Sequence, residues 1–328
     1  MELYIDTYGT YVHVKDEMFE IKTKKDKIEQ KHYFAAHKVS SIFLQKGMAI
    51  STDAIFLALK NNIDIVILDY NGFPCARIWH GKLGSTTKIR KKQLEASLNE
   101  QAVFWTKKWV MQKIQNQIDL LKDLKKNRAA KSEYMQQKID NINKLNKKLG
   151  DLKANKISDI EEQIRGLEGT AGRIYFETLN NIFPKQYQFN GRSSRPAKDP
   201  FNAFLNYSYG ILYSKIEKSL IIAGLDPYIG FLHRDDYNQK SLVFDYIEPY
   251  RTYADKVVFQ LFSAKKINKK HTDKITNGFT LNSEGKSILV QSFTKYMEQD
   301  NIRYNGRNQT RSNAMQMDAH HFANSLIK

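Results

Sequence analysis

Cysteine, proline and long apolar runs are all scarce in this sequence of 328 residues. Cys75 is its one cysteine, which excludes an intrachain disulfide and a cysteine zinc cluster and favours a reducing compartment. We expect Cys75 to be a small buried hydrophobe rather than a reactive thiol. Apolar runs such as residues 65–68 fall far short of the roughly 20 residues that a membrane helix needs. The amino end lacks the basic and apolar regions of a signal peptide, so we expect a cytoplasmic protein with no membrane association.

The sequence is rich in hydrophobic residues and in positive charge. Hydrophobic residues make up 41% and aromatic residues 12% of the chain, enough to build a core and to exclude wholesale disorder. Lys and Arg total 52 against 35 acidic residues, which gives a net charge of +17. This balance indicates a polyanionic partner, most often nucleic acid, and a merely solvated basic surface is the alternative.

The first 85 residues are predicted to form a small β domain. The apolar run at residues 63–68 is interrupted only by Asp64, which is typical of a strand covered on both faces. Ser51 is placed to cap one short helix at residues 54–59. The other β-prone runs are residues 4–6, 11–15, 19–22, 39–44 and 76–79.

Residues 86–328 are predicted to form a larger, all-helical domain. No proline occurs between Pro74 and Pro184, so long helices can run there without interruption. Two glycines and a serine loosen the chain at residues 81–85, where we place the domain boundary. The predicted fold class is therefore α+β, with a small N-terminal β domain followed by a helical C-terminal domain.

A basic helical hairpin is predicted at residues 107–156. Apolar residues recur there at helical and nearly coiled-coil spacing, with the break between two helices at residues 127–132. The segment holds 14 Lys and Arg against 5 Asp and Glu. It either lies along a phosphate backbone or a partner, or it is a solvated helical face, and charge alone does not separate these readings.

The common catalytic signatures are missing too. We find no Walker loop, no glycine-rich dinucleotide fingerprint and no nucleophile elbow, which argues against nucleotide hydrolysis, hydride transfer and acyl transfer. Glu168 stands out because glycine and alanine surround it at residues 166–172, near the start of an apolar helix. These small residues would let other backbone approach the carboxylate closely. The alternative is an acid that only complements the helix dipole.

A second candidate cluster contains His233, Asp245 and Glu248. His233 ends an apolar run, and the two acids share one face if residues 242–251 are helical. Two carboxylates and one imidazole, with water on the open positions, suit Mg²⁺ or Mn²⁺ better than a closed zinc site. On a basic protein such an ion indicates phosphodiester chemistry. The alternatives are a loop or core histidine and a salt bridge between Glu248 and Arg251.

Four motifs follow one another at residues 167–176, 199–202, 223–233 and 241–251. Together they resemble the glutamate, second, histidine and terminal acidic motifs of the CRISPR-associated adaptation integrases, the family called "Cas one". The β-then-α layout extends the resemblance across nearly the whole chain. The departure lies at residues 107–164, which form a longer and more basic helical link than is usual in the family.

The resemblance implies a catalytic site in the helical domain. The divalent ion, Mg²⁺ or Mn²⁺, would be held by Glu168, His233 and Glu248. Asp245 would be a nearby catalytic acid that supports or joins this site.

The resemblance also implies DNA contacts near the metal. Arg173, Tyr213 and Arg251 lie where they would help to hold DNA that is double-stranded, branched or provided with 3′ overhangs. For Tyr213 a place in the core is equally open, and Arg173 has the alternative of pairing with a neighbouring acid.

The activity that the resemblance implies is that of a metal-dependent DNA endonuclease and integrase, which inserts short DNA into a CRISPR array. A 3′ hydroxyl would attack a phosphodiester at the repeat boundary. A homodimer through the β domain is implied, with two dimers bridged by the small companion protein "Cas two" into a heterohexamer. The alternatives are a transposon-type integrase of the same fold and a non-catalytic DNA-binding assembly subunit.

Overall fold

The computed structural model describes residues 1–25, 28–79, 86–194, 196–233 and 239–328. The chain divides into two compact units, Met1–Gly84 and Ser85–Lys328. The boundary predicted at residues 81–85 lies outside the described residues. Among the described residues, no helix has the length and apolar character needed to cross a membrane.

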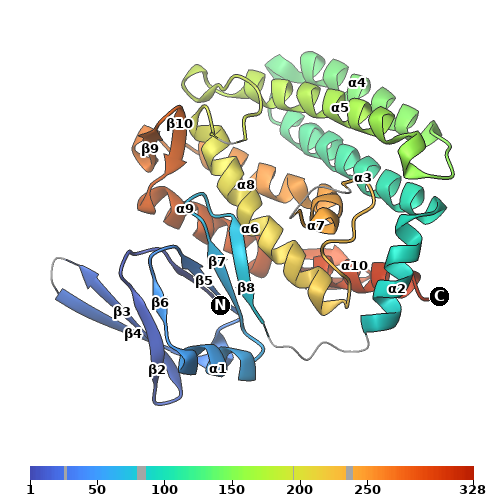
Figure 1. Ribbon diagram of the computed structural model, residues 1–328. Helices are drawn as coiled ribbons and strands as arrows, with labels where there is room; N and C mark the ends of the chain where they lie inside the picture. The colour runs from blue at the N-terminus through green and yellow to red at the C-terminus, as the bar shows by residue number, and fades with distance from the viewer. Residues whose placement is uncertain (26–27, 80–85, 195, 234–238) are drawn as a thin grey trace. The chain divides into compact units, whose positions relative to one another are not determined.

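The described residues of the first unit form two four-stranded sheets and one α-helix, α1 (Thr52–Lys60) (Figure 1). One sheet has the order β1-β5-β7-β8, in which the first three strands are parallel, and the other has the order β4-β3-β2-β6. The strands are β1 (Glu2–Ile5), β2 (Tyr11–Lys15), β3 (Met18–Lys25), β4 (Ile28–Ala35), β5 (Ser41–Gln45), β6 (Ala49–Ile50), β7 (Asp64–Leu68) and β8 (Pro74–Ile78).

The hydrophobic pattern explains the centre of this unit. Strand β5 is buried along its whole length, and β7 is buried at every residue but Ile67, as expected of strands covered on both faces. The Ser51 hydroxyl accepts a hydrogen bond from the Ala54 amide at 3.2 Å, which confirms the predicted cap of α1. Strand β4 was not predicted because residues 29–32 are polar and exposed, so they carry no alternating apolar pattern.

The expectation for Cys75 is wrong. Its side chain is exposed rather than buried. The reason is its strand, because β8 lies at the edge of its sheet and pairs only with β7 among the described strands.

The second unit is mainly helical, as predicted, and also holds two short hairpins, β9 (Thr272–Ile275) with β10 (Gly278–Leu281) and β11 (Asn301–Tyr304) with β12 (Arg307–Thr310). The all-helical description is therefore incomplete, since strands of only four residues give almost no periodic signal. The α-helices of this unit are α2 (Thr86–Ser97), α3 (Glu100–Lys125), α4 (Ser132–Asp151), α5 (Glu161–Ile182), α6 (Pro200–Ile222), α7 (Ser241–Tyr246), α8 (Arg251–Ser263), α9 (Ser283–Thr294) and α10 (Arg311–Ser325).

Helix α6 is the central helix of this unit. It is buried on nearly every side and packs against α8, α9 and α10 (Figure 1). Asp199 begins the helix, since its carboxylate accepts a hydrogen bond from the Asn202 amide at 2.8 Å and Pro200 occupies the first turn. The second motif of the sequence is therefore a helix start.

Helices α3, α4 and α5 pack against one another in a separate layer (Figure 1). The predicted break at residues 127–132 falls between α3 and α4. Helix α3 also contacts α8 and the short 3-10 turn Glu248–Tyr250, so one face of the basic segment belongs to the interior.

Candidate active site

Three elements of the helical unit bring charged side chains together. Glu168 lies in the third turn of α5, Glu248 opens the 3-10 turn before α8, and Lys113 projects from α3. Glu248 is buried, and Glu168 is only partly exposed. Segments far apart in the sequence thus converge at one place.

Lys113 joins the two glutamates. Its ammonium contacts Oε1 of Glu168 and lies 2.5 Å from Oε2 of Glu248. Burial alone would lower the pKa of Lys113, but the charges of Glu248 and Glu168 outweigh burial and raise it. The two carboxylates therefore share one cation.

Glu248 has a second cationic partner in Arg251. The guanidinium Nε and Nη2 each lie 2.8 Å from Oε1 of Glu248. Burial would raise the pKa of Glu248, but the charges of Arg251 and Lys113 lower it to about 2. The ion pair between Glu248 and Arg251, the alternative weighed from the sequence, is formed.

His233 and Asp245 make the other half of the cluster. The His233 Nδ1 lies 2.6 Å from Oδ1 of Asp245, whose carboxylate also accepts the backbone amides of Phe231, Leu232 and His233 at 2.5, 3.0 and 3.1 Å. Burial would lower the pKa of His233, but Asp245, Glu248 and Glu168 together raise it. In the neutral ring this bond puts the proton on Nδ1 and leaves the lone pair on Nε2.

A polar layer surrounds Arg251. Its Nη2 donates to the Tyr213 hydroxyl at 3.1 Å, and its guanidinium lies 5.1 Å from the centre of the Tyr209 ring. The Tyr209 and Tyr175 hydroxyls donate to buried Asp255 at 2.6 and 3.0 Å. Burial raises the pKa of Asp255 despite these two bonds. Tyr213 and Tyr209 thus hold Arg251 against Oε1 of Glu248.

Helix α3 packs against the segments that carry His233 and Glu248. The Trp109 ring stacks on Phe231, two residues before His233, with centres 5.7 Å apart, and meets Tyr246 edge-on. The Asn116 amide donates to the Pro249 carbonyl at 2.6 Å. The same helix that supplies Lys113 therefore holds the turns that carry His233 and Glu248.

The predicted DNA-contact residues occupy different environments. Tyr213 is buried, with its ring 5.0 Å from that of Phe244. Arg173 is exposed and pairs with Glu177 one turn along α5 at 3.7 Å. Arg251 is turned toward Glu248 and Tyr213. The structure thus places Arg251 beside Glu248, Tyr213 beside Arg251, and Arg173 on the surface of α5.

Two features of the site were not predicted. Lys113 was counted only as part of a basic surface, although its spacing of four from Trp109 places both on one helix face. The glycines at 166, 169 and 172 face open space, since a Cβ added to any of them would meet no atom within 4 Å, so no other described backbone of this chain approaches them closely. That part of the interpretation of Glu168 is wrong.

Within the described ranges, no group of three or more His, Cys, Asp and Glu side chains is assembled as a metal site. The position between Glu168 and Glu248 nevertheless holds a cation, the Lys113 ammonium. Against the opposing effect of burial, Glu248 and Glu168 both raise the pKa of His233, and two carboxylates with one imidazole have the chemistry of an Mg²⁺ or Mn²⁺ site. The donor types of these three residues therefore fit such an ion.

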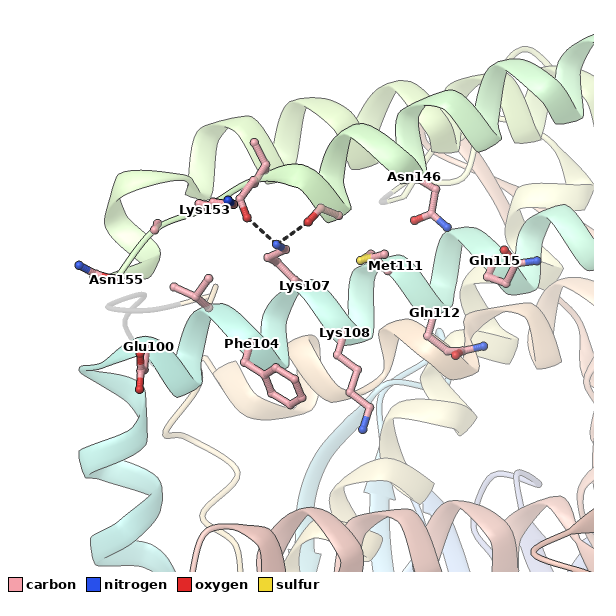
Figure 2. A pocket seen from close by; sticks show the side chains of 14 residues that line it. Glu100, Phe104, Lys107, Lys108, Met111, Gln112, Gln115, Asn146, Lys153 and Asn155 are labelled. Carbon is pink, nitrogen blue, oxygen red and sulfur yellow. Dashed lines mark hydrogen bonds between the residues drawn. The ribbon is translucent and has the colours of Figure 1, made fainter.

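A separate cavity of about 730 Å³ lies between α3 and the end of α4 (Figure 2). Phe104, Lys107, Met111 and Asn146 are among its lining residues. The Lys107 ammonium crosses it to donate to the carbonyls of Gly150, at 2.8 Å, and Leu152, at 2.5 Å. None of the residues predicted for the metal site lines it.

Residues 3–295 match the family model described as CRISPR associated protein Cas1. A curated relative, the CRISPR-associated endonuclease Cas1 1 of Archaeoglobus fulgidus, is 31% identical over 319 residues, covering 94% of this chain and 91% of the relative.

Two solved structures share the fold. A casposase bound to an integration product superposes with a TM-score of 0.84 at 23% identity, over 99% of this chain and 90% of that one. A Cas6-RT-Cas1–Cas2 complex superposes with a TM-score of 0.81 at 21% identity, over 99% of this chain and 35% of that chain.

Proposed function

Because this chain belongs to the CRISPR-associated Cas1 family, we propose that it is a metal-dependent DNA endonuclease and integrase of CRISPR adaptation. It inserts short DNA into a CRISPR array through attack of a 3′ hydroxyl on a phosphodiester at the repeat boundary. With water as the nucleophile, the same site cuts DNA. The observation that carries the proposal is the convergence of Glu168 and Glu248 on one cation beside the His233–Asp245 pair.

The residues that would hold Mg²⁺ or Mn²⁺ are Glu168, His233 through Nε2, and Glu248. When bound, the ion would polarise a phosphoryl oxygen and neutralise the charge that develops on it. Asp245 keeps the imidazole in the required tautomer and orientation. It is a positioning residue in this proposal.

Two arginines near or beyond the proposed metal site would bind phosphate groups of the DNA. Arg251 is held beside Glu248 by Tyr213, and its guanidinium matches the geometry of phosphate oxygens. Arg173, exposed on α5, would contact DNA farther from the metal. The net charge of +17 supplies the long-range attraction for DNA.

The partners in this proposal are DNA with duplex, branched or 3′-overhang structure, a second copy of the chain and Cas2. The fold likeness to a chain of a solved Cas6-RT-Cas1–Cas2 complex supports the last of these. Dimerisation through the β unit and a heterohexamer with Cas2 are the assembly we propose. Light scattering of the protein alone tests for the mass of the homodimer, and light scattering with Cas2 tests for the mass of the heterohexamer.

A strand-transfer assay tests the catalytic proposal. A 3′-hydroxyl oligonucleotide is joined to a repeat-containing plasmid in the presence of Cas2, with Mn²⁺ or EDTA. We expect Mn²⁺-dependent joining that His233→Ala abolishes and that His320→Ala, an exposed histidine of α10, leaves intact. Joining that survives in His233→Ala contradicts the proposed metal site.

A non-catalytic assembly subunit is distinguished by Glu168→Ala. A metal enzyme loses strand transfer and keeps DNA binding, whereas an assembly subunit keeps its function. Glu177→Ala is the matched control, because Glu177 lies on the same helix and is about half exposed.

The likeness to a casposase favours one further candidate, a transposon-type integrase. Joining to a repeat-containing target is compared with joining to random DNA of the same length. Preference for the repeat supports CRISPR adaptation, and equal joining supports the transposon-type reading.

A further inference from the structure

Lys113 occupies the position between the two carboxylates that we assign to the metal. Its ammonium reaches both, contacting Glu168 and lying 2.5 Å from Glu248, and its side chain is 12% exposed. We propose that the Lys113 ammonium and the divalent ion are alternative occupants of this pair of carboxylates. The lysine holds the site together before the ion arrives and withdraws when it binds. This inference rests on the proposed function, since it takes Glu168 and Glu248 as metal ligands.

Charge explains why the site needs a cation at all times. Glu248 is buried and Glu168 is largely shielded, so two unpaired carboxylates would repel each other in a region of low polarity. Arg251 neutralises only one oxygen of Glu248. Lys113 provides the remaining positive charge on the side that faces Glu168.

The two cations cannot share the position. Mg²⁺ draws its oxygen ligands to about 2.0–2.1 Å, which leaves no room for an ammonium in contact with the same two oxygens. Like charges at that separation also repel strongly. Lysine can leave without moving α3, because its charge sits on a flexible four-carbon stem.

Two effects of opposite direction follow for Lys113→Gln, which keeps a polar side chain and removes the charge. The variant should bind Mn²⁺ at least tenfold more tightly, because the ion no longer displaces a competing cation. Without metal it should melt at a lower temperature than the wild type, because the carboxylates have lost their counter-ion. Mn²⁺ should restore most of that loss by binding the folded state.

Lys107 provides a matched control on the same helix. Its ammonium is also partly buried but donates to two neutral carbonyls, those of Gly150 and Leu152 (Figure 2). Lys107→Gln should lower the melting temperature equally in EDTA and in Mn²⁺, with no change in Mn²⁺ affinity. Lys113→Arg, which keeps the charge, should not raise the affinity either.

The experiment is a calorimetric titration of the full-length proteins with Mn²⁺, together with melting curves in EDTA and in Mn²⁺. Glu168→Gln identifies the heat that belongs to this site. The exchange is supported if Lys113→Gln binds Mn²⁺ more tightly than the wild type while Lys107→Gln and Lys113→Arg do not. It is also supported if Mn²⁺ binding is detected only in Lys113→Gln. Equal or weaker binding overturns the exchange while leaving the metal site standing. If neither protein binds Mn²⁺ through Glu168, the exchange and the metal-dependent function fail together.

Discussion

At the scale of the residue, the carboxylate of Asp245 organises the histidine end of the site. It accepts three consecutive backbone amides and the imidazole of His233. Its oxygens are therefore used to fix a turn and a ring. Asp245 is therefore assigned to orienting the His233 ring rather than to holding the ion itself.

Asp245→Asn should weaken both Mn²⁺ binding and strand transfer by about 10–100-fold, as loss of an outer-shell partner of a metal-bound histidine commonly does. The amide NH₂ that replaces one oxygen faces backbone donors and cannot accept their hydrogen bonds. Calorimetric Mn²⁺ titration measures the effect. Asp140→Asn, at an exposed acid on α4, is the control. Unchanged Mn²⁺ affinity in Asp245→Asn would show that the ring needs no support from residue 245.

In the β unit, Glu20 predicts a dependence of stability on pH. The Tyr33 hydroxyl, 2.5 Å away, together with Lys22 and His13 lowers the pKa of Glu20 to about 2, against the opposing effect of burial. Its ordinary value is 4.5. A lowered pKa in the folded state means that the stabilisation is complete above pH 4.5 and is lost as the pH falls toward 2.

Glu20→Gln should therefore be less stable than the wild type at pH 6, and the difference should shrink steadily below pH 4.5. Urea unfolding of both proteins at several pH values measures this difference. A gap that stays constant down to pH 3 would refute the assignment.

Motif resemblance selected Glu168, His233, Asp245 and Glu248, and their catalytic role stays a prediction. The structure pairs Glu168 and Glu248 with Lys113, and His233 with Asp245. Lys113 was not selected, because nothing in the sequence distinguishes the one lysine of its segment that reaches Glu168 and Glu248 from the other lysines there. A charged residue on a long helix faces the interior only if another element packs against its side of the helix. Sequence spacing shows which residues share a side, but it does not show which side is covered.

At the scale of the element, helix α5 carries a bare strip of three glycines beside Glu168. A Cβ at Gly169 would meet nothing within 4 Å, and its backbone is not in the left-handed region. We expect Gly169→Ala to raise the free energy of unfolding by roughly 1 kcal/mol, the usual difference in helix propensity. Thermal and chemical unfolding measure it.

Gly278→Ala is the contrasting variant, since a Cβ there would collide with the backbone of Ala197, and it should destabilise the protein. If DNA passes over the glycine strip, Gly169→Leu will lower strand transfer without lowering stability. A loss of stability in Gly169→Ala would contradict the open space around this glycine.

Helix α4 allows the two readings of the basic hairpin to be separated. Lys144, Lys147 and Lys148 are all exposed on it. Their joint change to Gln should weaken binding to duplex DNA and reduce the slope of log affinity against log salt by up to about 2.7, or about 0.9 for each phosphate contact. Fluorescence anisotropy at several salt concentrations measures the slope. An unchanged slope would identify a solvated face.

Elements were predictable where apolar periodicity was strong. Strands β5 and β7 and the long helices α3 to α6 follow from it. Strand β4 and the hairpins β9–β10 and β11–β12 do not, because their residues are mostly polar or half-exposed and their pairing is fixed by turns and neighbours.

At the scale of the whole molecule, the net charge of +17 makes the proposed binding of DNA testable through its salt dependence. If six or more phosphates are contacted, affinity should fall about 10³-fold or more between 50 and 200 mM salt. Filter binding or anisotropy with a duplex of unrelated sequence tests this directly. An affinity that is nearly independent of salt would mean that the excess charge is only solvated.

Helix α3 has a mechanical consequence. It is one uninterrupted rod of 26 residues, about 39 Å long. Lys107 fastens it to the end of α4, and farther along Asn116 donates a hydrogen bond to the carbonyl of Pro249 in the 3-10 turn Glu248–Tyr250. A stiff helix moves as a unit, so a displacement of either end of α3 would also displace Lys113 relative to the two carboxylates.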